Sequence, residues 1–374
     1  MRKNPMLAIF TTVFIDLLGF GILIPVFPLL ITDGPFRVTP DGWSFTQGMI
    51  MLGWLQAIYP FCMFIAAPIL GQLSDRHGRR PVLALSIFGT AIGYVLFAIG
   101  ISTGNLPLLF AARGLDGLTG GNLAVAQAAI GDISTHENRA KNFGYMGAAF
   151  GMGFIVGPYL GGKLSSPSVS FYGLFDTPHW FGATTPFWFA AVLALLNCTA
   201  VLTTFPETIK EKFHGGKIRV GQSLNNVVNG FKSDRLRVIL ISSFLFSAGF
   251  TFFTTFFGVY LRNKFSFSSS KIGDYFAIVG LCIALSQGLV VGRVAKKLVD
   301  FKVLKFSMFG TGAMMLIYFL TPTTSSMYLY MVIPFFATFN GLCMANTSSL
   351  ISRSAEMGKQ GEAMGIYASV SSLS

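Results

Sequence analysis

Charge is scarce in this sequence. Only 11% of its 374 residues are Asp, Glu, Lys or Arg, whereas 52% are hydrophobic and the mean hydropathy is +0.63. Soluble domains carry about 25% charged residues. This shortage excludes an ordinary soluble protein and predicts an all-α polytopic membrane protein, whose helices cross the bilayer many times.

Cysteine and histidine are also scarce, with four of each. The cysteines fall inside apolar runs and the histidines lie in loops without metal-ligand spacing, so neither a disulfide framework nor a metal site is expected. Gly100–Gly104 matches the pattern G-x-S-x-G, but it ends an apolar run and lacks the strand-turn-helix context of a nucleophile elbow. We therefore expect no enzyme activity and no cofactor.

Apolar runs of about 20 residues, the length that spans a bilayer, dominate the chain. Ten are expected, at 6–30, 48–70, 82–101, 106–130, 143–164, 185–205, 238–261, 272–294, 303–320 and 328–351. A further run begins at Ala363 and reaches only 12 residues at Ser374. The sequence thus predicts a chain truncated within an eleventh helix.

The net charge of +12 is explained by topology. With the amino terminus inside, 21 of the 27 Lys and Arg residues fall in cytoplasmic loops and 5 in external loops. Cytoplasmic loops of membrane proteins carry such an excess of cations. We therefore predict a cytoplasmic amino terminus, and the basic balance requires no nucleic-acid partner.

An internal repeat indicates two related halves. At an offset of 221 residues, glycines near loop-helix junctions coincide: Gly71 with Gly292, Gly120 with Gly341, and Gly144 with Gly365. The segment 207–237 is basic and lacks a spanning run. The predicted organisation is a six-helix amino-terminal half at 1–206, a cytoplasmic linker at 207–237 and an incomplete carboxy-terminal half at 238–374.

A charged turn, GQLSDRHGRRP, separates the second and third runs at 71–81. Its pattern G-x-L-x-D-R-x-G-R-R resembles the signature of major facilitator superfamily transporters. A plain cytoplasmic loop would explain the arginines but neither the glycines nor the acid. The resemblance implies a fold of two six-helix halves and a cytoplasmic latch made by Gly71, Asp75, Arg76, Gly78, Arg79 and Arg80.

The fifth run matches a glycine pattern of the same family, G-x8-G-x3-G-P-x2-G-G. Its positions are Gly144, Gly153, Gly157, Pro158, Gly161 and Gly162. Small residues four apart also serve ordinary close packing of helices, which explains part of the series. The resemblance associates the complete pattern with antiporters.

Asp16, Arg113 and Asp116 are expected deep in the membrane. A central charge costs about 2.5 to 3.5 kcal/mol, so Arg113 needs a partner, and Asp116 lies three residues away on the same helix face. Together with Gln127, these residues form our predicted proton-coupling and transport site. Asp16 is the first choice for the proton carrier because Arg113 should keep Asp116 ionised; the reverse assignment and a purely structural ion pair remain alternatives.

The first five runs look most like the tetracycline/proton antiporter branch, notably FIDLLGFG at Phe14–Gly21. Gly93 is a departure, because that branch carries an acid there, and we expect no acid within the spans of the second half. These departures and the phenylalanine-rich run from Phe244 to Phe257 favour an apolar or weakly cationic drug-like substrate over tetracycline.

The resemblance implies a proton-coupled exporter of small amphipathic molecules, acting as a monomer in a bacterial inner membrane or plasma membrane. Its expected partners are the small-molecule substrate, protons and membrane lipid. One alternative is a nutrient or metabolite symporter or facilitator on the same fold, since a fold does not fix a function. A non-transporting membrane receptor or assembly factor is another.

Overall fold

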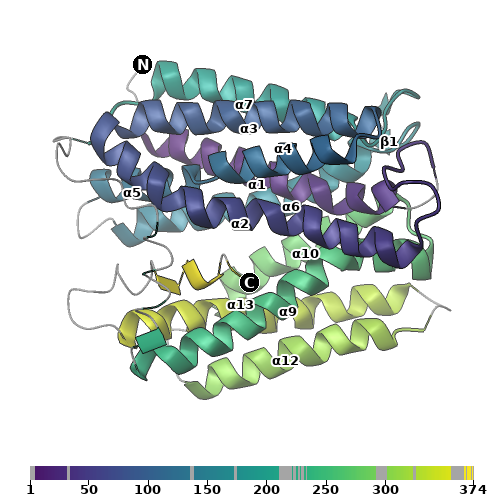
Figure 1. Ribbon diagram of the computed structural model, residues 1–374. Coiled ribbons are helices and arrows are strands. Elements are labelled where there is room, and N and C mark those ends of the chain that lie inside the picture. Colours follow the sequence, from purple (N-terminus) through teal and green to yellow (C-terminus); the bar gives the residue numbers. More distant parts are fainter. Residues whose placement is uncertain are drawn as a thin grey trace. The chain divides into compact units, whose positions relative to one another are not determined.

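Helices make up almost all of the chain that the computed structural model describes (Figure 1). The described residues are 5–31, 34–134, 139–171, 175–209, 234–291, 301–322 and 326–354, with isolated residues at 221–232 and after 365. Contacts divide the chain into unit 1, Met1–Gly221 with Ser268–Asp274, and unit 2, Gln222–Phe267 with Tyr275–Ser374. Most of the predicted linker and the repeat partners Gly292 and Gly365 lie outside the described residues.

Unit 1 is a bundle of long helices. They are α1 (Pro5–Ile31), α2 (Phe45–His77), α3 (Arg79–Ser102), α4 (Leu106–Thr119), α5 (Asn122–Ile133), α6 (Arg139–Leu164) and α7 (Thr185–Thr204). The loop between α6 and α7 contains a short antiparallel pair, β1 (Ser170–Phe171) and β2 (Phe175–Asp176). Ser44 begins α2 with a capping box to Gln47, and the Asn105 side chain caps α4, so these helix ends have the partners that their free N–H groups require.

Unit 2 is built around aromatic packing. Its helices are α9 (Asp234–Phe265), the part of α10 (Ser269–Ser286) from Tyr275 onward, the π-helix η1 (Gln287–Val291), α12 (Phe301–Leu320) and α13 (Met327–Ser354). The ring centroids of Phe253 and Phe257 lie 5.7 and 5.0 Å from that of Tyr318. All three side chains are buried, so Phe253 and Phe257 belong to the core of unit 2, whereas Phe252 is exposed.

Eight of the described helices are long and apolar enough to cross a membrane: α1, α2, α3, α7, α9, α10, α12 and α13. Two expected spans are not among them. One is α6, and the other is the run 106–130, which the structure divides into α4 and α5 at Gly120–Gly121.

The break between α4 and α5 corrects the prediction of one continuous helix. It lies where α2 passes very close: a Cβ atom on Gly121 would be 3.0 Å from the Cα of Ala67, and one on Gly120 would be 2.8 Å from the hydroxyl of Tyr59. Glycine is required here because any side chain would push α2 away.

The charged turn is also shorter than predicted. Helix α2 continues through Gly71 to His77 and α3 begins at Arg79, so Gly78 alone separates them. Its φ of +106° lies in a region that L side chains rarely adopt. One glycine therefore reverses the chain between two long helices.

Helices α1 and α6 run side by side in direct backbone contact (Figure 1). Cβ atoms added to Gly157 and Gly161 would lie 2.7 and 2.6 Å from the carbonyl oxygens of Leu18 and Ile22. One added to Gly153 would meet the side chain of Leu17 at 2.6 Å. The glycine series thus forms the surface on which α6 packs against α1.

This packing predicts that Gly161→Ala lowers thermal stability. The new methyl group must separate α6 from α1, and overpacking of this kind costs about 1 to 3 kcal/mol. Gly151→Ala is the matched control, because a Cβ atom there meets nothing within 4 Å. Thermal unfolding of the two variants in detergent tests the difference; equal melting temperatures would show that the α1–α6 contact can adjust.

Candidate transport site

A buried ion pair lies in the middle of α4. The side chain of Arg113 is 3% exposed, and its Nη1 donates a hydrogen bond of 2.9 Å to Oδ2 of Asp116. The Tyr59 ring of α2 lies 4.5 Å from the guanidinium carbon. Among the described residues, none accepts a hydrogen bond from Arg113 Nε or Nη2. The aromatic face therefore supplements a single carboxylate in compensating the charge.

Asp16 of α1 has a different kind of partner. Its Oδ1 accepts a hydrogen bond of 2.8 Å from Nδ2 of Asn122, the first residue of α5. Asn122 is 1% exposed. Thus one acid of the predicted site is paired with a cation and the other with a neutral amide, although the charges of Asp16 and Asp116 interact electrostatically.

Glycine in α3 makes room for Asp116. A Cβ atom on Gly93 would lie 3.2 Å from the Cβ of Asp116. Gly93, which stands where the tetracycline/proton antiporter branch carries an acid, therefore packs directly against the acid of α4. The hydroxyl of Thr90, one turn earlier in α3, lies 3.2 Å from the hydroxyl of Thr119, three residues after Asp116. The adjoining cavity has a volume of about 10 Å³, which is enough for a single water molecule.

Gln127 does not join the group. It lies on an exposed position of α5, and the described contacts do not connect it with Asp16, Arg113 or Asp116. The predicted set of four therefore reduces to three residues, to which the structure adds Asn122. Sequence reasoning missed Asn122 because a single polar residue next to two glycines carries no pattern of its own.

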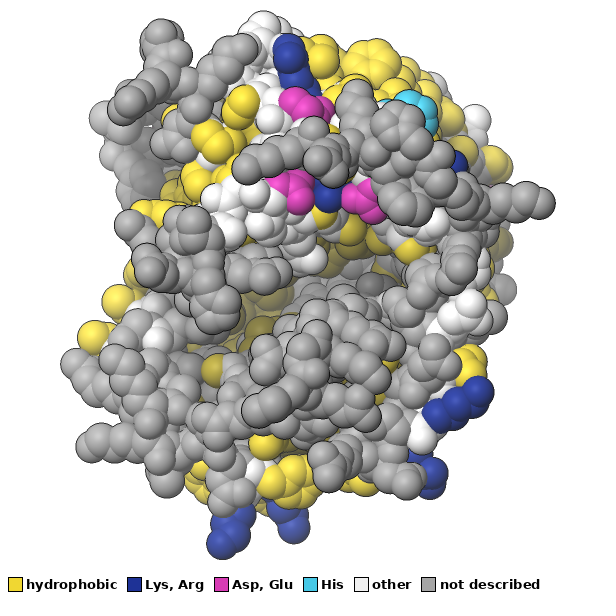
Figure 2. Space-filling model, turned by 90° about the vertical axis from the view of Figure 1, so that its left-hand side faces the viewer, with side chains coloured by type: hydrophobic (Ala, Val, Ile, Leu, Met, Phe, Trp, Pro, Cys, Tyr) yellow, Lys and Arg dark blue, Asp and Glu magenta, His cyan; other side chains and the backbone are white. Residues whose placement is uncertain are grey.

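Four of the predicted latch residues, Asp75, Gly78, Arg79 and Arg80, take part in a cluster at one end of unit 1, where acidic and basic side chains lie together (Figure 2). Arg79 Nη1 lies 2.6 Å from Asp75 Oδ1, and Arg79 Nε lies 2.9 Å from Asp132 Oδ2. The carboxylate of Glu207 accepts hydrogen bonds from the backbone N–H groups of Arg79 (2.8 Å) and Arg80 (3.3 Å) at the start of α3. An anion at a helix amino terminus is favoured by the helix dipole.

Asp132 and Glu207 were not predicted as members of this cluster. The available signals were the polar turn that contains Asp132 and the Pro-Glu-Thr sequence that ends α7. Gly71 lies in α2 with open space around its Cα, and Arg76 is half-buried in the last turn. Gly144 lies within α6, where its packing is outside the described contacts.

A second ion pair, whose acid is 40% exposed, corrects the expectation that the second half holds no acid within its spans. Nζ of Lys163, at the end of α6, lies 3.0 Å from Oδ2 of Asp274 and 2.9 Å from Oγ of Ser270. Both partners are in the first turns of α10, in the segment that belongs to unit 1. Beside this pair, Gly162 and Gly273 bring the two backbones together. Asp274 was overlooked because it is the third residue of the expected span 272–294.

The model of the Major Facilitator Superfamily matches residues 9–374. The chain belongs to this superfamily. It is 30% identical to the class C tetracycline resistance protein of Escherichia coli over 99% of this chain and 87% of that protein. It is 33% identical to the class B protein of the same organism, over 79% of this chain and 68% of that protein, and 28% identical to multidrug resistance protein 1 of Bacillus subtilis, over 79% and 66%.

Solved structures agree on the fold. The human organic anion transporter MFSD10 (TETRAN) superposes with a TM-score of 0.69 at 22% identity, covering 99% of this chain and 90% of that chain. A variant of the nucleoside transporter NupG gives a TM-score of 0.73 at 13% identity, with 99% and 88% covered. These neighbours establish a major facilitator fold for this chain.

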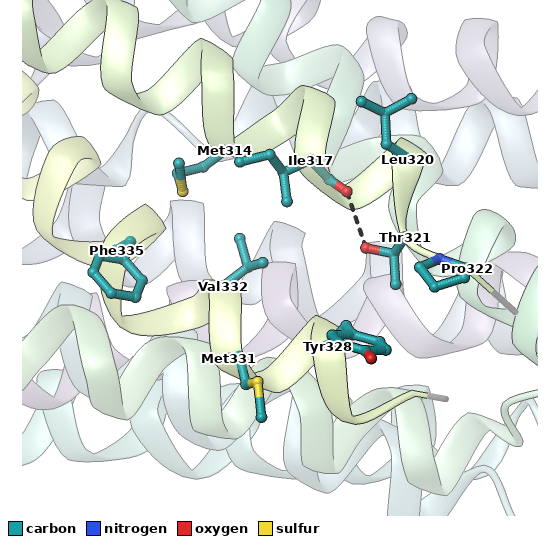
Figure 3. A pocket seen from close by; sticks show the side chains of 9 residues that line it. All are labelled: Met314, Ile317, Leu320, Thr321, Pro322, Tyr328, Met331, Val332 and Phe335. Atoms are coloured by element: carbon teal, nitrogen blue, oxygen red, sulfur yellow. Dashed lines mark hydrogen bonds between the residues drawn. The ribbon is translucent and has the colours of Figure 1, made fainter. Parts of the chain in front are cut away.

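Unit 2 of this superfamily member has an apolar pocket of about 490 Å³ between α12 and α13 (Figure 3). Leu320, Phe335 and Met331 contribute to its lining and are themselves exposed on the outside of the unit. The hydroxyl of Thr321 donates to the carbonyl oxygen of Ile317 in its own helix. None of the described residues that line this pocket is charged, which distinguishes it from the site in unit 1.

The Arg113–Asp116 pair predicts strong energetic coupling. Removing one partner of a buried ion pair leaves an uncompensated charge and costs about 3 to 5 kcal/mol. We expect Arg113→Gln to lower the melting temperature sharply, and the double variant Arg113→Gln/Asp116→Asn to recover most of the loss. A double-mutant cycle of thermal unfolding in detergent measures the coupling; additive effects would rule out the pairing.

Proposed function

We propose that this protein is a proton-coupled antiporter that exports a small amphipathic, drug-like molecule by alternating access. The observation that carries the proposal is the unequal pairing of two acids, the buried Asp116 with Arg113 and the partly buried Asp16 with Asn122. Relatives named for tetracycline and multidrug resistance support drug efflux as the direction of transport.

The unequal pairing assigns different tasks to the two acids. An ionised carboxylate within the membrane is unfavourable unless a cation compensates it. Asp116 has such a cation in contact, whereas the hydrogen-bonding partner of Asp16 is neutral. Asp16 is therefore our candidate to bind and release the transported proton, with Arg113 and Asp116 as the fixed charges beside it.

The packing of α6 supports exchange. Gly153 packs closely against Leu17, the residue next to Asp16. A shift of α6 along α1 would therefore change the surroundings of Asp16. In an antiporter, substrate and proton occupy the protein in alternation, which requires such a link between helix movement and the proton site.

We place the protein as a monomer in the bacterial inner membrane, with the amino terminus in the cytoplasm, two halves at 1–206 and 238–374, and the linker 207–237 also in the cytoplasm. The positive-inside count supports this orientation. The proposed partners are the substrate, protons and lipid; catalysis, cofactors and nucleic acid have no part in the mechanism.

Flux in proteoliposomes tests the proposal. With ethidium as a lipophilic cationic probe and a pH gradient imposed in each direction, we expect uphill movement of the probe against the proton flow. Asp16→Asn should abolish uphill movement but keep probe-for-probe exchange down a gradient.

Other outcomes have distinct meanings. Uphill movement in the same direction as protons would identify a symporter instead. If Asp16→Asn keeps full uphill transport while Asp116→Asn abolishes it, the roles of the acids are reversed. If both variants keep it, this site does not couple protons.

The charged cluster generates a separate prediction. We propose that Asp75 and the arginines around it act as a latch between conformations, so Asp75→Asn should lower the turnover rate severalfold with little change in KM. Asp41→Asn, in an exposed loop, is the control. A raised KM with an unchanged turnover rate would place Asp75 in substrate binding and refute the latch.

A further inference from the structure

We propose that Asn122 is a positioning residue that holds Asp16 by hydrogen bonds in both of its protonation states. This inference rests on the proposed function, because it concerns the acid to which we assign the proton. It adds a residue whose amide donates a hydrogen bond to Asp16 when the acid is ionised and accepts one when the acid is protonated.

The helix break fixes the position of Asn122. Gly120 and Gly121 interrupt the long helix, and Asn122 begins α5 at the level of Asp16 in α1. Gly121 sits against the backbone of Ala67, so the start of α5 cannot move without moving α2. The amide is therefore presented to Asp16 by backbone that is packed on a third helix.

One atom of the Asn122 amide, Oδ1, has no hydrogen-bond partner among the described residues. Nδ2 of Asn122 donates to Asp16, but Oδ1 is fully buried and receives no hydrogen bond from the described residues. A buried acceptor without a donor costs about 1 to 3 kcal/mol. Such an atom in a residue that is 1% exposed calls for a second state in which it is used.

Protonation of Asp16 supplies the missing donor. An ionised carboxylate only accepts hydrogen bonds, whereas a carboxylic acid also donates one through its O–H. When a proton from water binds to Asp16, a half-turn of the Asn122 amide brings Oδ1 to this O–H. When Asp16 gives its proton back to water, the reverse rotation restores the hydrogen bond from Nδ2 to the carboxylate.

Other groups near Asp16 do not replace this function. Asp116 and Arg113 of α4 are engaged with each other, Tyr59 of α2 lies under the guanidinium, and Tyr94 of α3 rests against Gly19. Helix α7 contains no charged residue, Asp132 of α5 pairs with Arg79, and Lys163 of α6 pairs with Asp274.

The chain offers a matched control beside the same helix. Asn197 of α7 is 4% exposed, and its amide contacts the hydroxyl of Thr12, one turn before Asp16 in α1. Replacement of Asn197 by Leu removes an equally buried amide next to α1 without touching the acid. A purely structural role of Asn122 predicts that both replacements behave alike.

Infrared difference spectroscopy provides the direct readout. In purified protein, the carbonyl band of protonated Asp16 is identified by its loss in Asp16→Asn. We expect Asn122→Leu to move this band to higher frequency, as for an acid without a hydrogen-bonded partner, and Asn197→Leu to leave it in place. In proteoliposomes, uphill ethidium transport should fall about tenfold in Asn122→Leu, corresponding to about 1.4 kcal/mol, with exchange retained.

The pair Asn122→Ser and Asn122→Ala covers the case in which Asn122→Leu does not fold. Serine keeps a donor and an acceptor and should preserve the band position, whereas alanine should move it. An unmoved band in Asn122→Leu or Asn122→Ala overturns the inference. If Asp16→Asn itself retains uphill transport, the proposed function fails first; if it loses uphill transport while the Asn122 variants match Asn197→Leu, only this inference fails.

Discussion

The compensation of charge inside the membrane is the constraint on which unit 1 depends. The Arg113 side chain is buried among apolar helices, so Asp116 and the face of Tyr59 must stay in contact with it to compensate its charge. This requirement fixes the register of α4 against α2 and α3. Asp16 lies beside this ion pair without a cation of its own. The function we propose follows from this difference between the partners of Asp16 and Asp116.

Close approach of helices makes this arrangement possible. Because Gly93 has no side chain, Asp116 can pack against α3. In the same way, Gly121 lets α2 approach the start of α5, and the glycines of α6 let α1 pack against that helix. In each case a single methyl group would separate the elements. The many glycines of this chain therefore position charged groups as much as they permit packing.

Much of this could be predicted from the sequence. Apolar runs located the helices, and the spacing of Arg113 and Asp116 predicted their contact, because both signals are local. The break at Gly120–Gly121 could not be predicted, since it depends on the approach of Ala67 from another helix. Asn122, Glu207 and the Lys163–Asp274 pair join partners that lie 106 to 128 residues apart, and only tertiary packing brings them together, which no local pattern encodes.

The most direct test of the central claim is a count of protons upon substrate binding. Ethidium is added to purified protein in a weakly buffered detergent solution. A pH indicator records the protons that are released, and ethidium fluorescence records binding. Our account predicts that the wild-type protein releases protons and that Asp16→Asn binds ethidium without releasing any. Undiminished release from Asp16→Asn would contradict it.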